Sequence, residues 1–146
     1  MIKLLQSLLL VVLTSIVFQA YAAEDDKPFA EHKVVLQISD ADPTKQTLVL
    51  NVASNLIKAY GPDKVDVEIV AFGPGLRLMF ADNGNTGRIS GLTDNGVRFA
   101  ACSVTIKKIT KVLGKEPAIN SQARVVPGGV PRIIELVNQD YILVKP

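Results

Sequence analysis

Short apolar segments alternate with amphipathic segments along almost the whole chain after residue 32, and this alternation limits the possible folds more than any other feature. The apolar segments are rich in β-branched residues and predict strands at 33–38, 65–72, 97–102, 124–126 and 141–146. Between them, apolar side chains recur at helical spacing, as at Leu48, Val52 and Leu56. Strands that alternate with helices favour a parallel sheet covered on both faces. We therefore expect a single α/β domain, a three-layer α/β/α arrangement with a mainly parallel five-stranded sheet.

Turn residues indicate where the helices begin and end. Asp42 before Pro43 is typical of a helix N-cap, and the Gly61-Pro62 pair predicts the end of the same helix. The "GPG" sequence at 73–75 interrupts the second strand and precedes a short predicted helix at 76–81. The remaining helices are expected at 88–95, 103–114 and 130–140.

The N-terminus has the pattern of a secretory signal peptide. Lys3 gives a short basic region, "LLQSLLLVVLTSIVF" a hydrophobic region, and Ala20-Tyr21-Ala22 a small-residue cleavage site. We expect removal of residues 1–22, a flexible lead-in at 23–32, and a periplasmic or secreted domain at 33–146. An uncleaved anchor is the alternative, because the segment nearly reaches the ~20 residues that a spanning helix needs. The acidic "EDD" after the site favours cleavage, with no stable membrane association afterwards.

Composition excludes several classes of function. The net charge of +2 gives no indication of nucleic-acid or membrane-surface binding. With Cys102 as its single cysteine and His32 as its single histidine, the chain has no intrachain disulfide and no convincing His/Cys metal cluster. No metal and no organic cofactor is expected. Asp40 and Asp42 are weak acid/base candidates, because loop solvation and helix capping explain them as well.

Cys102 is the main candidate for chemistry. Ligands of open parallel α/β sheets bind beyond the carboxyl ends of the strands, and Cys102 ends the third predicted strand. Either Cys102 or Ser103 caps the next helix, where free N–H groups and the helix dipole stabilise a thiolate. Five cations and no acid lie between Asp94 and Glu116. Packing of the thiol as a small buried hydrophobe is the alternative, and the residues alone leave both possibilities open.

Two glycine pairs are weaker ligand-binding candidates. Gly73 and Gly75 in "FGPGLRL" resemble half of a phosphate-binding loop, and Gly128 and Gly129 in "VPGGVPR" precede a helix. Ordinary turn geometry explains both pairs equally well. Ser103, beside Cys102, is a candidate of the same weak kind.

With these elements placed, the chain resembles the DsrE/DsrF-like family of small sulfur-relay proteins. The resemblance rests on "KVVLQISD", "VEIVAFGPGLRLMF", "GVRFAACSVTI" and "VPGGVPRIIELVNQDYILVKP", which cover nearly all of residues 33–146. It implies a parallel five-stranded sheet, association as a homo-oligomer, and a persulfide-carrying cysteine at the position of Cys102. The predicted export differs from the cytoplasmic address of the sulfur-relay members.

The sequence thus predicts an exported sulfur carrier or sulfur-oxidation accessory protein. Cys102 would accept sulfane sulfur as a persulfide from a donor protein and pass it to an acceptor protein, at most as a sulfurtransferase-type carrier. The alternative is a non-catalytic oligomeric module that binds a ligand or a protein, with Cys102 as core packing. In that module the stripe Leu76, Met79 and Phe80 would form either an oligomer contact or part of the core. A disulfide between two copies is a third possibility.

Overall fold

The computed structural model describes residue 27 and residues 29–146. The predicted signal peptide, residues 1–22, and half of the predicted lead-in at 23–32 lie outside the described residues. Within the described part of the chain, no helix combines the length and the apolar character needed to cross a membrane.

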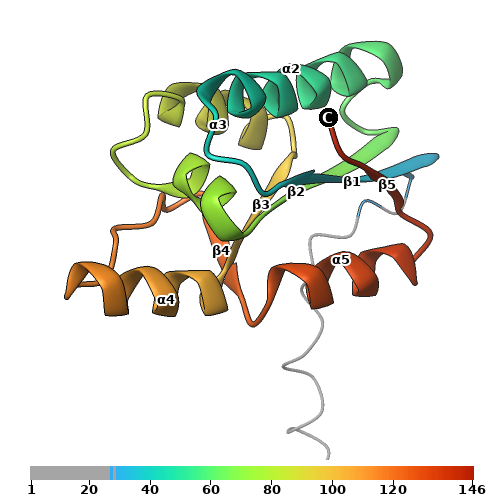
Figure 1. The fold of residues 1–146 in the computed structure, drawn as a ribbon. Helices are drawn as coiled ribbons and strands as arrows, with labels where there is room; N and C mark the ends of the chain where they lie inside the picture. Colours follow the sequence, from blue (N-terminus) through green and yellow to red (C-terminus); the bar gives the residue numbers. More distant parts are fainter. Residues whose placement is uncertain (1–26, 28) are drawn as a thin grey trace, which may run out of the picture.

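The described residues form one sheet of five parallel strands in the order β4-β3-β2-β1-β5. Helices cover both faces of this sheet, so the expected three-layer α/β/α fold is confirmed (Figure 1). The strands are β1 (His32–Ile38), β2 (Val65–Ala71), β3 (Arg98–Cys102), β4 (Ala123–Val126) and β5 (Ile142–Val144). On one face lie α2 (Pro43–Tyr60) and α3 (Thr86–Thr93), and on the other α4 (Ser103–Leu113) and α5 (Gly129–Val137).

The central strands are buried on both faces for most of their length, which is typical of a parallel sheet covered by helices. Every residue of β2 is buried, and β2 pairs with β1 in register from His32–Val65 to Ile38–Ala71. The larger core lies under α2 and α3, and a smaller one around Val35, Val70 and Leu136 lies under α5. The sheet therefore provides a rigid frame whose carboxyl edge positions the loops of the candidate site.

The ends of α2 agree with the predicted caps. The Asp42 carboxylate accepts a hydrogen bond from the Thr44 backbone N–H at 2.7 Å, and Pro43 occupies the first helical position. Gly61 ends the helix with φ +88° and donates its N–H to the Ile57 carbonyl at 2.8 Å. A positive φ at this position favours glycine over any other residue.

The segment after β2 differs from the prediction. A 3₁₀ helix, η1 (Gly73–Met79), includes the "GPG" sequence instead of starting after it. The chain turns directly back over the end of β1, because Gly75 has no side chain and its backbone approaches that of Ile38. Leu76 and Met79 are fully buried, so these two residues of the predicted stripe belong to the core.

The N-terminal boundary of the domain also differs slightly. His32 starts β1 instead of ending the lead-in, and its ring lies 4.0 Å from the ring of Tyr60, centroid to centroid. The backbone N–H groups of Glu31 and His32 both donate to the Lys64 carbonyl. This contact fixes the entry of the chain into the sheet.

A buried ionic network on the α5 side of the sheet is not anticipated from the sequence. Arg132 donates two hydrogen bonds of 2.8 Å to the carboxylate of Glu68, and Arg98 pairs with Asp66 at 3.1 Å. The Tyr141 hydroxyl donates to Asp66 at 2.5 Å. Burial, together with this hydrogen bond, raises the pKa of Tyr141 to about 12. The network ties α5 and the start of β5 to the centre of the sheet.

Candidate functional site

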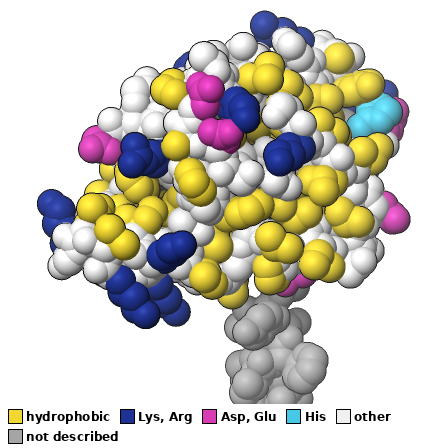
Figure 2. Space-filling model, viewed as in Figure 1, with side chains coloured by type: hydrophobic (Ala, Val, Ile, Leu, Met, Phe, Trp, Pro, Cys, Tyr) yellow, Lys and Arg dark blue, Asp and Glu magenta, His cyan; other side chains and the backbone are white. Residues whose placement is uncertain are grey.

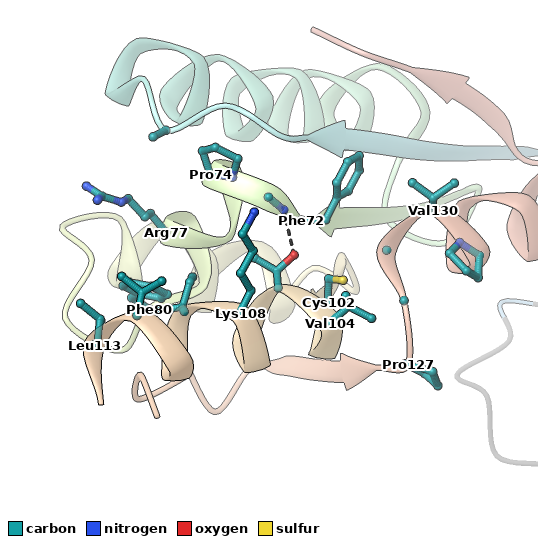
Figure 3. A pocket seen from close by; sticks show the side chains of 18 residues that line it. Phe72, Pro74, Arg77, Phe80, Cys102, Val104, Lys108, Leu113, Pro127 and Val130 are labelled. Carbon is teal, nitrogen blue, oxygen red and sulfur yellow. Dashed lines mark hydrogen bonds between the residues drawn. The ribbon is translucent and has the colours of Figure 1, made fainter. Parts of the chain in front are cut away.

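A pocket of about 960 Å³ opens at the carboxyl end of β2 and β3, where the sequence predicts ligand binding. Its walls come from η1, from α4 and from the loop that leads into α5 (Figure 3). Most of its lining is apolar, including Phe72, Phe80, Val104 and Val130. Cys102 lines the pocket between the start of α4 and the α5 loop, so its sulfur faces a cavity large enough for a small ligand.

The start of α4 places the thiol among hydrogen-bond donors. Cys102 is the N-cap residue of α4, and only 5% of its surface is exposed. Burial alone raises the pKa of a thiol. Hydrogen bonds to the sulfur outweigh burial and lower the pKa of Cys102 below its ordinary value; the donors are the Thr105 hydroxyl and the backbone N–H groups of Thr105, Gly129 and Val104. The site therefore favours a thiolate.

Thr105 connects the thiol to the opposite wall of the pocket. Its hydroxyl oxygen accepts a hydrogen bond of 2.9 Å from the Gly73 backbone N–H (Figure 3). An oxygen that accepts this bond keeps its own proton for donation, and the Cys102 sulfur is the partner that receives it. Thr105 thus orients a donor toward Cys102 and joins η1 to α4.

Replacing Thr105 with valine is expected to make Cys102 less reactive. Valine keeps the shape of the side chain but loses the hydroxyl, and a hydrogen bond to a charged group contributes ~1.5 kcal/mol. The thiolate fraction, and with it the rate of iodoacetamide alkylation at pH 7, should fall about tenfold. Thr105→Ser keeps the hydroxyl and should restore most of the rate. If the valine variant and the parent chain are alkylated at equal rates, Thr105 does not contribute to the reactivity of Cys102.

The structure brings together some of the predicted site residues and separates others. Gly73, Gly128 and Gly129 line the pocket with Cys102. Gly75 and Ser103 are not among the lining residues: Gly75 packs on the end of β1, and the Ser103 hydroxyl donates to the Pro127 carbonyl at 2.9 Å.

Gly129 is required by close packing. A Cβ atom at Gly129 would lie 2.7 Å from the Phe72 Cβ atom and 2.9 Å from its ring. Real side chains do not approach so closely, so a larger residue at this position would displace Phe72. Gly129 therefore lets the α5 loop approach Phe72 and brings its own N–H to Cys102.

The two aspartates near the end of β1 have structural roles. Asp42 caps α2, and Asp40 pairs with Lys45 at 2.6 Å on the surface. Neither lines the pocket. Among the described residues, no group of three or more His, Cys, Asp or Glu side chains is placed to hold a metal ion.

The positive charge at the pocket comes only in part from the cations that the sequence indicates. Of the five cations between residues 94 and 116, Lys108 is the one that lines the pocket. Arg98 lies at the opposite end of β3, about 13 Å away along the strand, and pairs with Asp66. Arg77, from η1, supplies a second pocket cation that spacing from Cys102 does not reveal.

The apolar stripe of α4 is largely uncovered. Ile106 is buried, whereas Val104, Val112 and Leu113 are 64%, 77% and 60% exposed. Figure 2 shows hydrophobic side chains gathered over the lower half of the same view, where α4 and α5 lie. Contiguous apolar surface of this kind marks a ligand or protein contact.

No protein-family model matches the chain, and neither does any curated protein. Among solved structures, the chain is similar to MTH1491 from Methanobacterium thermoautotrophicum, a protein of unknown function. The two are 27% identical, the match covers 80% of this chain and 100% of that chain, and the TM-score is 0.70. The similarity supports the α/β fold, and because the function of that protein is unknown, it gives no function to transfer.

Proposed function

We propose that this protein is an exported sulfur carrier or sulfur-oxidation accessory protein, in which Cys102 holds sulfane sulfur as a persulfide. The single observation that supports this proposal most is the setting of Cys102. Its sulfur faces a pocket, and the Thr105 hydroxyl and the N–H groups at the start of α4 and at Gly129 lower its pKa and so favour the thiolate. A cysteine that served only as packing would need neither feature. The resemblance to the DsrE/DsrF-like family points to the same residue.

The proposed chemistry requires no external oxidant. The Cys102 thiolate attacks the terminal sulfane sulfur of a donor such as thiosulfate, and the new Sγ–S bond forms as the donor's S–S bond breaks. Sulfite leaves with the electron pair, and Cys102 becomes a persulfide anion. An acceptor thiolate then attacks the outer sulfur, which regenerates the Cys102 thiolate. Donor and acceptor proteins are the proposed partners, and no cofactor takes part.

The proposed homo-oligomer rests on a different part of the surface. β5 is an edge strand, and its residues Ile142 and Leu143 are 67% and 45% exposed. Ile134 and Val137 on the adjacent α5 are exposed as well. A second copy that covers this apolar edge would protect it from less specific pairing. Sedimentation of the mature protein should therefore give a mass above that of the monomer.

Intact-mass spectrometry tests the carrier. The mature protein, reduced and then incubated with polysulfide or thiosulfate, is expected to gain about 32 Da, the mass of one sulfur atom. The adduct should be absent in Cys102→Ser and should disappear when a thiol acceptor is added. A parent chain that never gains this mass contradicts the carrier and favours the binding module. A band of twice the mass on a non-reducing gel would instead indicate a disulfide between copies.

A further inference from the structure

Two cations line the Cys102 pocket without a carboxylate to balance them. Arg77 comes from η1 and Lys108 from α4, and Figure 3 shows Lys108 rising from α4 toward η1 while Arg77 extends outward from η1. Neither forms an ion pair with any acidic residue in the part of the chain that the structure describes. The lining itself contains no Asp or Glu among the described residues. The charge at the pocket is therefore positive and free to bind an anion.

The rest of the lining suits an apolar molecule. The aromatic rings of Phe72 and Phe80 and the aliphatic side chains of Leu113 and Val130 face the cavity from different elements. A volume of about 960 Å³ lies near the upper end of the range typical of small-molecule sites, ~300–1,000 Å³. Inorganic thiosulfate would leave most of this apolar surface without a contact. The pocket is better matched to a ligand with an apolar body and an anionic head.

We propose that the pocket binds an amphipathic organic anion, and that the sulfur donor is of this class: an organic thiosulfonate, R–SO₂–S⁻. The anionic head, which carries the sulfane sulfur, lies at Cys102 with Lys108 beside it and Arg77 as the second cation of the pocket, and the apolar R group extends along Phe80 and Leu113. The assignment of this ligand as the donor rests on the proposed persulfide function, whereas its binding does not. The proposal thus adds a small-molecule donor to a carrier that passes its sulfur to a protein.

The transfer step balances without another reactant. The Cys102 thiolate attacks the terminal sulfur of R–SO₂–S⁻, a Sγ–S bond forms and the S–SO₂ bond breaks. The sulfinate R–SO₂⁻ leaves with the electron pair, and the persulfide anion stays on Cys102. The cations stabilise the sulfinate that departs as well as the thiosulfonate that enters. The hydrogen-bond donors around Cys102 stabilise the persulfide anion that remains.

Binding of 1-octanesulfonate to Cys102→Ser tests this site apart from any sulfur transfer. The sulfonate has the shape and charge of a thiosulfonate but no sulfane sulfur to give. Calorimetric titration is expected to show one site per chain. The double variant Arg77→Gln, Lys108→Gln should bind at least tenfold more weakly, since both cations are lost. Lys107→Gln, at the neighbouring exposed position outside the pocket lining, is the matched control and should bind as the parent does.

Three results would overturn the proposal. One is no binding of octanesulfonate, including the case in which a second copy of the chain closes the pocket. Another is binding of octylammonium as tight as that of octanesulfonate, which would mean that Arg77 and Lys108 do not favour an anion over a cation. The third is an equal loss of binding in the Lys107 control. Binding with the expected pattern but no persulfide on the parent chain would keep the anion site and refute the carrier, so the two failures are distinguishable.

Discussion

Replacing Arg132 with leucine is expected to lower the free energy of unfolding by about 3–5 kcal/mol. Arg132 is 5% exposed and Glu68 is 1% exposed, and the two hydrogen bonds between them are 2.8 Å long. Leucine removes the guanidinium and leaves a buried carboxylate with Arg98, 3.4 Å away, as its remaining cation. Urea denaturation of parent and variant, monitored by circular dichroism, measures the difference.

A double variant separates the ion pair from the packing of the Arg132 side chain. Glu68→Leu together with Arg132→Leu removes both charges, and buried pairs replaced by apolar residues often lose little stability. We expect the double variant to regain most of the stability that Arg132→Leu alone loses. A single variant as stable as the parent would contradict the importance of this network. A double variant no better than the single one would assign the loss to packing instead.

Gly75→Ala is expected to cost about 2–3 kcal/mol of stability, the upper part of the range for overpacked sites. The new Cβ atom would lie 2.5 Å from the Ile38 carbonyl oxygen and 2.7 Å from the Ser39 nitrogen. These are backbone atoms, so no side-chain rotation relieves the contact. Because η1 carries Gly73 and Arg77, the variant should also weaken octanesulfonate binding.

Gly91→Ala is the matched control for this substitution. Gly91 lies within α3, and a Cβ atom there meets nothing within 4 Å. Alanine is a better helix former than glycine, so this variant should be more stable by about 0.5–1 kcal/mol. Thermal unfolding of both variants beside the parent gives the comparison. Equal stability of the two variants would mean that the approach of η1 to β1 is not as close as described.

The fold is predictable from the sequence because its signals are local. Each strand of the sheet is a short segment rich in apolar residues, and α2 carries its own cap residues in Asp42 and Gly61. Residue spacing is enough to identify such elements. The start of η1 is predicted less well, since the position of Gly75 depends on a backbone contact with Ile38, far away in the sequence.

The candidate site is predictable only in part. Cys102 can be placed at the carboxyl edge of the sheet because it ends a predicted strand and directly precedes a predicted helix. Thr105 follows it by three residues, the spacing at which a helix places a side chain beside its N-cap, so the sequence is sufficient to indicate Thr105 as a neighbour of Cys102. Arg77 comes from another element, and its approach to the pocket depends on how η1 packs.

The buried ionic network is visible in the sequence only through its two acidic residues, and not through their partners. Asp66 and Glu68 alternate with valine along β2, which puts both carboxylates on one face of a strand that is buried throughout. Buried charges require partners. The partners Arg98, Arg132 and Tyr141 come from three other parts of the chain, and local spacing cannot identify them.

The pH dependence of Cys102 alkylation tests the central claim, that this residue is a reactive thiolate facing a pocket. The chain has one cysteine, so all iodoacetamide incorporated into the protein reports on Cys102. Because hydrogen bonds lower the pKa of Cys102, the half-maximal rate in the folded protein should occur at a lower pH than in the same chain unfolded in urea. A folded chain that resists alkylation, or that reacts with a midpoint at or above that of the unfolded chain, would contradict the account and leave Cys102 as a packing residue.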